Sequence, residues 1–193
     1  MIDYSQNKEQ EHILRYFDGR IGTFLDLGAN DGKTFSNTYA LAQLGWRGMC
    51  VDASPKAFKA LQETHKSNDR IHCLNLALAN ECGPITLHEA SDTLLSSLDP
   101  QQRETWKSYN LGWDAVQVQG VTFDVLMDGI RRFEFISMDI EGMDIDILKQ
   151  INLDAYGVQL LCIEHGGRQS EIMDICKGWQ VLYYGDINLI LSR

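Results

Sequence analysis

The chain has 193 residues, of which 44% are hydrophobic and 23% charged, and its formal net charge is −10 at pH 7. This length fits one domain, 1–193, and the balance of apolar and charged residues excludes the disordered and fibrous classes of protein. The excess of acids disfavours nucleic acid as a partner, because binding to a phosphate backbone depends on Lys and Arg releasing counterions.

The sequence shows no membrane or secretion signal. No segment approaches the roughly 18 uninterrupted apolar residues of a membrane helix. The first residues, MIDYSQNKEQEH, are polar and acidic, whereas a signal peptide begins with a basic and then an apolar stretch. Five cysteines without a CxxC pair suggest neither a disulfide framework nor a cysteine zinc site. We therefore expect a cytoplasmic protein without a membrane partner.

Helices and strands are predicted to alternate along the chain. Short apolar runs that end at a glycine or an acid predict buried strands, and apolar residues three or four positions apart predict the helices that cover them. In chain order the expected elements are a helix at 9–17 within an N-terminal cover segment 1–20, a strand at 23–27, a helix at 33–44, a strand at 48–52, a helix opened by Ser54 and Pro55, a strand at 71–78, an edge strand at 116–121, a short helix at 122–129, a strand at 133–139, a helix around 145–151, a strand at 158–164, a helix at 171–177 and a closing hairpin over 179–191.

Residues 89–115 form the least regular part of the sequence. We expect a short helix after Pro100 there and no clear strand. The alternation elsewhere predicts an α/β fold with a doubly wound, mostly parallel, Rossmann-like sheet, right-handed crossovers and a C-terminal antiparallel hairpin. In such sheets ligands bind beyond the carboxyl ends of the strands, near the point where the strand order reverses.

The stretch DLGANDG, residues 26–32, lies where the first strand turns into the first helix. Gly28 and Gly32 would let the backbone approach a ligand closely, and Asn30 tolerates a left-handed backbone. Asp26 would face a cationic or hydroxyl-rich ligand. Because the GxGxxG fingerprint of NAD sites is absent, S-adenosylmethionine, with its positive ammonium and sulfonium, fits this loop better.

A second acid, Asp52, ends the second strand. A carboxylate at this place can accept hydrogen bonds from the ribose hydroxyls of an adenosine. Together with its neighbour Ala53, Asp52 completes the expected adenosine site.

Six stretches of the chain resemble the FkbM family of S-adenosylmethionine-dependent methyltransferases. They are DLGANDG (26–32), VDASPKAF (51–58), LALANECGPITLHEA (76–90), SSL (96–98), FISMDIEGMDIDIL (135–148) and LLCIEH (160–165). The resemblance implies a class I methyltransferase fold and methyl transfer to an oxygen atom, often on a sugar or a secondary metabolite. It also implies that Asn75 and Ala77 lie near the adenine and Ser97 near the cofactor.

The chain departs from the pattern of this family at three positions. Met138 stands where a lysine is common, Asp144 where a glutamate is frequent, and Asp52 where the second strand often ends in glutamate. Either acid can hold a ribose, so the last change is mild, whereas the first two bear on the acceptor.

Two pairs of polar residues follow neighbouring strands and should meet in one crevice. Asp139 and Glu141 follow one strand, and Glu164 and His165 follow the next. Asp139 and Glu164 could hold a divalent cation, Mg²⁺ or Ca²⁺, that acidifies an acceptor hydroxyl. Alternatively, His165 could take the hydroxyl proton as a general base. Either role would prepare an oxyanion that attacks the methyl group.

We therefore expect an O-methyltransferase that acts on a small hydroxylated acceptor such as a sugar or glycan. Residues 89–115 and the N-terminal helix are expected to select the acceptor. Two alternatives stay open: an NAD-binding oxidoreductase, which would need the missing GxGxxG, and a non-catalytic cofactor-binding interaction protein, which the acids at both crevice strands disfavour.

Overall fold

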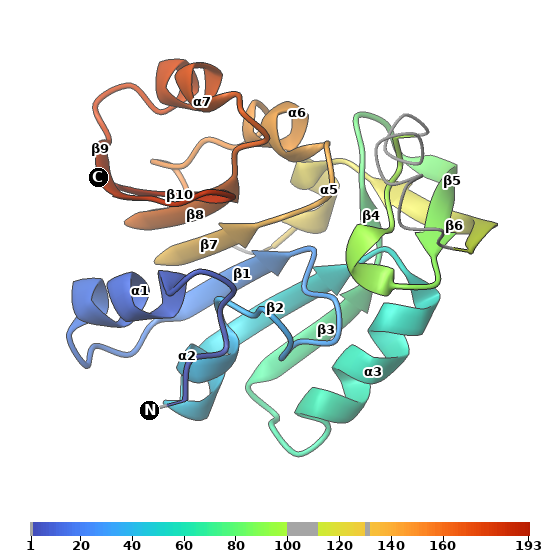
Figure 1. Cartoon of the computed structure of the whole chain (residues 1–193), viewed down its shortest axis with the longest axis horizontal. Helices are drawn as coiled ribbons and strands as arrows, with labels where there is room; N and C mark the ends of the chain where they lie inside the picture. Colours follow the sequence, from blue (N-terminus) through green and yellow to red (C-terminus); the bar gives the residue numbers. More distant parts are fainter. Residues whose placement is uncertain (1, 100–111, 130–131) are drawn as a thin grey trace.

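The computed structural model describes residues 2–99, 112–129 and 132–193 (Figure 1). The helices are α1 (Glu9–Phe17), α2 (Tyr39–Gln43), α3 (Pro55–His65), α5 (Phe123–Leu126), α6 (Asp144–Leu148) and α7 (Gln169–Ile175), with a 3₁₀ turn η1 at Thr93–Leu95. The strands are β1 (Thr23–Leu27), β2 (Arg47–Asp52), β3 (Ile71–Asn75), β4 (Ala77–Leu78), β5 (Gly83–Ala90), β6 (Trp113–Val121), β7 (Phe135–Met138), β8 (Leu160–Glu164), β9 (Gln180–Tyr184) and β10 (Asn188–Ser192). Within the described ranges no helix has the length and apolar character needed to cross a bilayer.

Seven strands form the main sheet in the order β3-β2-β1-β7-β8-β10-β9. The pairs from β3 to β8 are parallel, and β10 runs antiparallel to both of its neighbours. The predicted doubly wound sheet and its C-terminal hairpin are therefore confirmed. Because the chain winds outward from β1 to β3 and then from β7 to β8, the strand order reverses between β1 and β7. Their carboxyl ends define the crevice in which such folds bind ligands.

Both faces of the main sheet are covered by helices, which explains why its central strands β7 and β8 are buried along nearly their whole length (Figure 1). One apolar cluster joins residues of α1, α2 and α3 to the sheet, and the other joins residues of α5, α6 and α7. Neighbouring positions of β1 take opposite faces: Phe24 belongs to the first cluster and Leu25 to the second. Ile13 and Phe17 of α1 are buried in the first cluster, as their helical spacing predicts.

A second, three-stranded sheet has the order β4-β6-β5. The single strand expected at 71–78 is wrong, because the chain leaves the main sheet after Asn75 and pairs in the second sheet from Ala77. The prediction of an edge strand at 116–121 is wrong at the end of this segment, since β4 pairs with it at Gly120 and Val121, whereas the residues before them pair with β5 alone. The second sheet also takes in Ala90 and Trp113, inside the segment expected to lack strands. The short helix expected after Pro100 lies outside the described residues.

The helix expected at 33–44 is helical only from Tyr39 onward. Before it, polar side chains take the backbone amides that a helix would use. Oδ1 of Asp31 accepts hydrogen bonds from the backbone N–H groups of Lys33 (2.8 Å) and Thr34 (2.7 Å). This competition between side chain and backbone keeps the start of the segment in turns that face the crevice.

Candidate active site

Gly28 is held at the crevice by the backbone of a neighbouring strand end. Its φ is +83°, and a Cβ atom at this position would lie 1.7 Å from the carbonyl oxygen of Asp139. Its N–H donates to the carbonyl of Val51 over 2.9 Å. The end of β1 therefore packs directly between the ends of β2 and β7, and only glycine fits there.

The other glycine of the loop has a packing role. Gly32 has φ +75°, and a Cβ atom there would lie 2.6 Å from Cδ1 of Leu61 and 2.8 Å from Nε2 of His65. The loop thus rests on α3 at this point, away from the cavities described below. Asn30, with φ +47°, has the left-handed backbone that the sequence predicts.

Asp52 fastens the glycine loop to the end of β2. Its Oδ2 accepts from the backbone N–H of Asn30 (2.7 Å), and its Oδ1 accepts from the backbone N–H of Ser54 (2.8 Å). A carboxylate has about four acceptor positions, so two are left for a ligand. Burial raises the pKa of Asp52 to about 6.

A first cavity, here named cavity A, opens at the carboxyl ends of β1 and β2. It encloses about 650 Å³ of space not filled by atoms, its mouth included. Leu76, Leu78 and Leu87 provide apolar walls. Of the expected cofactor residues, the lining includes Gly28, Asn30, Asp52, Ala53 and Ala77. Apolar walls beside the carboxylate of Asp52 suit an adenine ring and a ribose.

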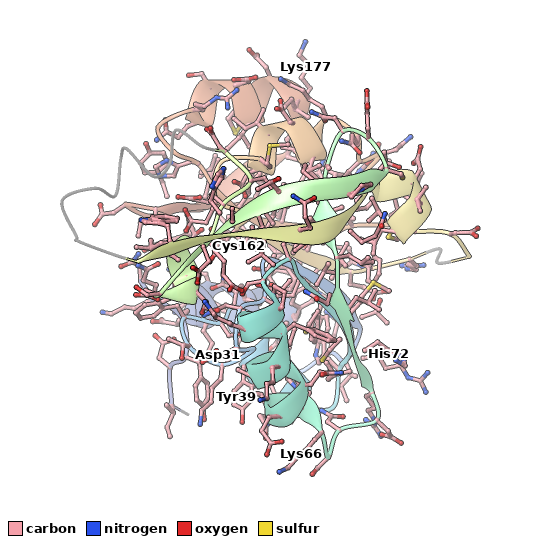
Figure 2. All side chains as sticks on the ribbon, turned by 90° about the vertical axis from the view of Figure 1, so that its right-hand side faces the viewer. Asp31, Tyr39, Lys66, His72, Cys162 and Lys177 are labelled. Carbon is pink, nitrogen blue, oxygen red and sulfur yellow. The ribbon has the colours of Figure 1, made fainter. Side chains whose placement is uncertain are left out.

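Asn75 and Ser97, two further expected cofactor residues, lie behind this lining. Nδ2 of Asn75 donates to the carbonyl oxygens of Asp52 (2.9 Å) and Ala53 (3.0 Å). Oγ of Ser97, which is 1% exposed, donates to the carbonyl oxygen of Glu141 (2.6 Å). Both residues therefore hold loops that shape cavity A instead of lining it. Figure 2 views the molecule from this side: β5 and β6 cross the view, and α3 runs below them toward Lys66.

A second cavity, cavity B, adjoins cavity A. It encloses about 1400 Å³, its mouth included. Both cavities are lined by Gly28, Asn30, Leu94, Asp139 and Glu141. They therefore meet at the loop that follows β7, and they form one continuous site at the carboxyl edge of the sheet.

Asp139 and Glu164, from the ends of β7 and β8, lie together in cavity B. Their carboxyl groups are hydrogen-bonded to each other. Burial and the charge of Glu164 hold the pKa of Asp139 well above its usual range, and burial with the charge of Asp144 raises the pKa of Glu164 to about 7. Two adjacent carboxyls of this kind share a proton near neutral pH.

Glu141 adds a third carboxyl group to this cluster. Its φ is +51°, and it lines both cavities. Burial, with the charges of Glu164 and Asp144, raises its pKa to about 8.

Asp144 shapes the loop after β7, a role that our sequence analysis missed. Its Oδ1 accepts from the N–H of Ile140 (3.0 Å) and its Oδ2 from the N–H of Gly142 (3.2 Å). The available signal was an acid at the first position of a short helix, directly after a glycine-containing turn. Asp144 therefore fixes the backbone on which Asp139 and Glu141 stand.

Asp26 lines cavity B and not cavity A. It is 5% exposed, and its Oδ2 accepts a hydrogen bond from Oγ1 of Thr38 over 2.6 Å. Burial raises its pKa to about 7. Asp26 is thus a buried acid that gains from a cationic ligand beside it.

His165 lies outside both cavities, and its ring is fully engaged. Nε2 lies 3.2 Å from the carbonyl oxygen of Gly185, and Nδ1 accepts from the N–H of Gly167 over 3.1 Å. This pattern corresponds to a neutral ring that carries its proton on Nε2. His165 ties the loop after β8 to the C-terminal hairpin, and we remove it from the set of candidate bases.

A metal site at Asp139 and Glu164 finds no support in the geometry. Among the residues that the structure describes, no group of three or more His, Cys, Asp or Glu side chains is arranged to hold a metal ion. We therefore assign no metal to the pair.

A doubly wound sheet with one reversed strand, a glycine loop and an acid at the end of the second strand defines the class I methyltransferase fold. Residues 26–191 match the model of the methyltransferase FkbM domain, and the chain belongs to this family. No curated protein sequence matches the chain.

Solved structures share this fold at low sequence identity. A methyltransferase from Geobacter sulfurreducens has a TM-score of 0.55 and 11% identity, over 100% of this chain and 80% of that one. A ribosomal protein L11 methylase from Lactobacillus delbrueckii subsp. bulgaricus has a TM-score of 0.54 and 16% identity, over 96% of this chain and 76% of that one. The resemblance found in the sequence is thus confirmed.

Proposed function

We propose that this chain is an S-adenosylmethionine-dependent O-methyltransferase that acts on a hydroxyl group of a small acceptor such as a sugar or glycan. The observation that carries the proposal is the junction of cavity A, which contains Asp52, with cavity B, which contains Asp139 and Glu164. A cytoplasmic location and the absence of nucleic-acid and membrane partners stay predictions from the sequence.

The residues present fit the cofactor. Leu76, Leu78 and Leu87 would enclose the adenine, and Asp52 would accept hydrogen bonds from the ribose hydroxyls. Asp26, in cavity B, would face the positive methionine end. When bound, S-adenosylmethionine supplies an electrophilic methyl group.

Glu164 is the candidate general base. Its pKa of about 7 lets it be ionised at neutral pH and still take a proton from a hydroxyl group. Asp139, hydrogen-bonded to it, keeps the shared proton and orients the carboxylate. The hydroxyl proton would pass to Glu164 while the acceptor oxygen gains the methyl group, the bond from methyl to sulfur would break, and S-adenosylhomocysteine would be the leaving group.

Calorimetric titration separates this proposal from its alternatives. S-adenosylmethionine and S-adenosylhomocysteine should bind, and NAD should not. Tight NAD binding without S-adenosylmethionine binding would overturn the proposal. A screen of glycans and nucleosides with a radiolabelled methyl donor would then find acceptors, and NMR of the product would locate the new methyl group. A methyl group on nitrogen or carbon would contradict O-methylation.

A further inference from the structure

Cavity B is lined by acids without any base. Among the described residues no Lys, Arg or His side chain contributes to its wall. The carboxyl groups are those of Asp26, Asp92, Asp139, Glu141 and Glu164. The ammonium and carboxylate of a bound S-adenosylmethionine cancel, so this cofactor brings only the one positive charge of its sulfonium. A cation would therefore find carboxyl partners whose ionisation it favours, whereas an anionic acceptor such as a sugar phosphate would oppose their ionisation.

Two buried amides add unpartnered acceptors to the same wall. Asn37 and Asn188 are 8% and 4% exposed, and both line cavity B. Within the described part of the chain, Oδ1 of each has no hydrogen-bond partner. Buried polar atoms are nearly always satisfied in folded proteins. These two oxygens therefore need a donor, and a ligand in cavity B, which both residues line, would be placed to supply one.

The orientation of Asn188 is fixed by a carboxylate behind it. Nδ2 of Asn188 donates to Oε1 of Glu9 over 3.0 Å, and Glu9 is 0% exposed. Because Oε1 of Glu9 accepts this hydrogen bond, the amide nitrogen faces Glu9 and the amide oxygen faces away from it. Asn188 is thus held as an acceptor.

An exposed aromatic ring lies at the same cavity. Phe35 lines cavity B, is 49% exposed and has φ +54°, an uncommon conformation for a bulky residue. The face of an aromatic ring attracts a cation and can cover the apolar side of a sugar ring. The wall of cavity B thus combines one aromatic face with carboxyl groups and two unpartnered amide oxygens.

We infer that the acceptor is a positively charged amino sugar, a small ring that carries hydroxyl groups and a protonated amine. Its ammonium group meets the carboxyl groups of cavity B, its hydroxyls donate to Asn37 and Asn188, and its ring covers Phe35. The inference rests on the proposed function and names the substrate class of the same site.

Three probes that share the same kind of sugar ring but differ in charge test this inference. The full chain saturated with S-adenosylhomocysteine is titrated calorimetrically with glucosamine, glucose and glucuronate. We expect glucosamine to bind about tenfold more tightly than glucose, because charge-assisted hydrogen bonds are roughly twice as strong as neutral ones, and glucuronate not to bind. Equal binding of the three probes, preference for glucuronate, or no binding of glucosamine would each overturn the inference.

Two variants test whether residues in the wall of cavity B cause the preference for glucosamine. Asn188→Ala and Phe35→Ala should each weaken glucosamine binding about fivefold or more, by loss of an acceptor or of a ring face, while S-adenosylhomocysteine affinity stays unchanged. Val125→Ala, at a 54% exposed position outside the lining of both cavities, is the matched control. If Asn188→Ala fails to fold, Phe35→Ala provides the test, because Phe35 is exposed. Unchanged glucosamine binding in Phe35→Ala overturns the inference.

The same titration keeps the two proposals apart. A wild-type chain that fails to bind S-adenosylhomocysteine contradicts the proposed function. A chain that binds it but shows no preference for the positively charged probe contradicts the acceptor class alone.

Discussion

The backbone N–H of Asn30 donates a hydrogen bond of 2.7 Å to Oδ2 of Asp52. One carboxylate thus sets the shape of the glycine loop and also presents free acceptor positions to cavity A. The cofactor affinity of this site should therefore depend on its charge more than on any single apolar wall.

Replacement of Asp52 by asparagine tests this dependence. Asp52→Asn keeps the size of the side chain but removes the charge and half of the acceptor capacity. We expect S-adenosylhomocysteine affinity to fall by about 10-fold to 100-fold, the range for loss of a hydrogen bond to a charged group, and Asp52→Ala to lose at least as much. Calorimetry measures the change, with Asp124→Asn, at an exposed position of α5, as control. Undiminished affinity would show that Asp52 holds only the loop.

The carboxyl pair at the ends of β7 and β8 should control turnover. Glu164→Gln should lower turnover by about 10²-fold to 10⁴-fold, the contribution of a general base, and Asp139→Ala should also lose turnover, with cofactor binding retained in both. Methyl transfer from radiolabelled cofactor to a screened acceptor is the measurement.

His165→Gln is the informative comparison. This variant should keep turnover. It should lower the free energy of unfolding by about 1–3 kcal/mol, because the hydrogen bonds of the His165 ring with Gly167 and Gly185 are lost. Loss of turnover in His165→Gln with normal turnover in Glu164→Gln would return the role of base to the histidine.

The pH dependence of kcat/KM should report the titration of the carboxyl pair Asp139 and Glu164 in the free enzyme. The pKa of Glu164 is raised to about 7, so the base is protonated and inactive well below this pH. We expect kcat/KM to rise with pH and to level off above about pH 7. Both pH 5.5 and pH 8 lie about one unit or more from this pKa, so the rise should be visible between them. A flat profile of kcat/KM over this range, with the chain folded throughout, would argue against a carboxyl base.

Stability without ligand should fall as pH rises. The pKa values of four buried carboxyls are raised well above 4, to about 7 for Asp26, about 6 for Asp52, about 8 for Glu141 and about 7 for Glu164. The folded chain binds these protons more tightly than the unfolded chain, so the stabilisation is complete below about pH 4 and is lost as pH rises to about 8.

Thermal melts of the ligand-free chain measure this effect. Glu89 and Glu134 have lowered pKa values, and their contribution is already present above about pH 4.5, so they do not mask it. We expect Tm to be lower at pH 8 than at pH 5.5 by about 10 °C or more, because one unit of pKa shift corresponds to about 1.4 kcal/mol and Tm changes by roughly 2–4 °C per kcal/mol for this size. Asp26→Asn should shrink the difference. A higher Tm at pH 8 would contradict the burial of these groups.

Two glycine substitutions separate backbone strain from steric exclusion. Gly28→Ala would place a Cβ atom 1.7 Å from the carbonyl oxygen of Asp139, and we expect a loss of about 3 kcal/mol or more in stability, with cofactor binding impaired. Gly129 has a similar φ, +78°, but a Cβ atom there would meet no atom of the described residues within 4 Å apart from its chain neighbours, so Gly129→Ala should cost only about 1 kcal/mol. Equal losses in chemical denaturation would mean that strain alone governs residue 28.

Local chemistry explains which features could be predicted from the sequence. The cap formed by Ser54, whose Oγ accepts from the N–H of Ala57, and the left-handed Asn30 are properties of a few adjacent residues. The doubly wound, mostly parallel character of the main sheet follows from alternation and handedness. Features that depend on distant partners were missed or misjudged: β6 is central because β4 pairs with its far side, and His165 is engaged by Gly185, twenty residues later. The sequence places a histidine after a strand but does not show which atoms its ring will meet.

The buried hydrogen bond between Glu9 and Asn188 connects the first helix to the wall of cavity B, which Asn188 lines. Gln6, just before α1, lines cavity B as well. Under the proposed function we therefore expect the leading segment to contribute to acceptor preference, and the strand ends to carry out methyl transfer. If residues 1–17 are replaced by the corresponding segment of another family member, we consequently expect the acceptor preference to change and the affinity for S-adenosylmethionine to stay the same.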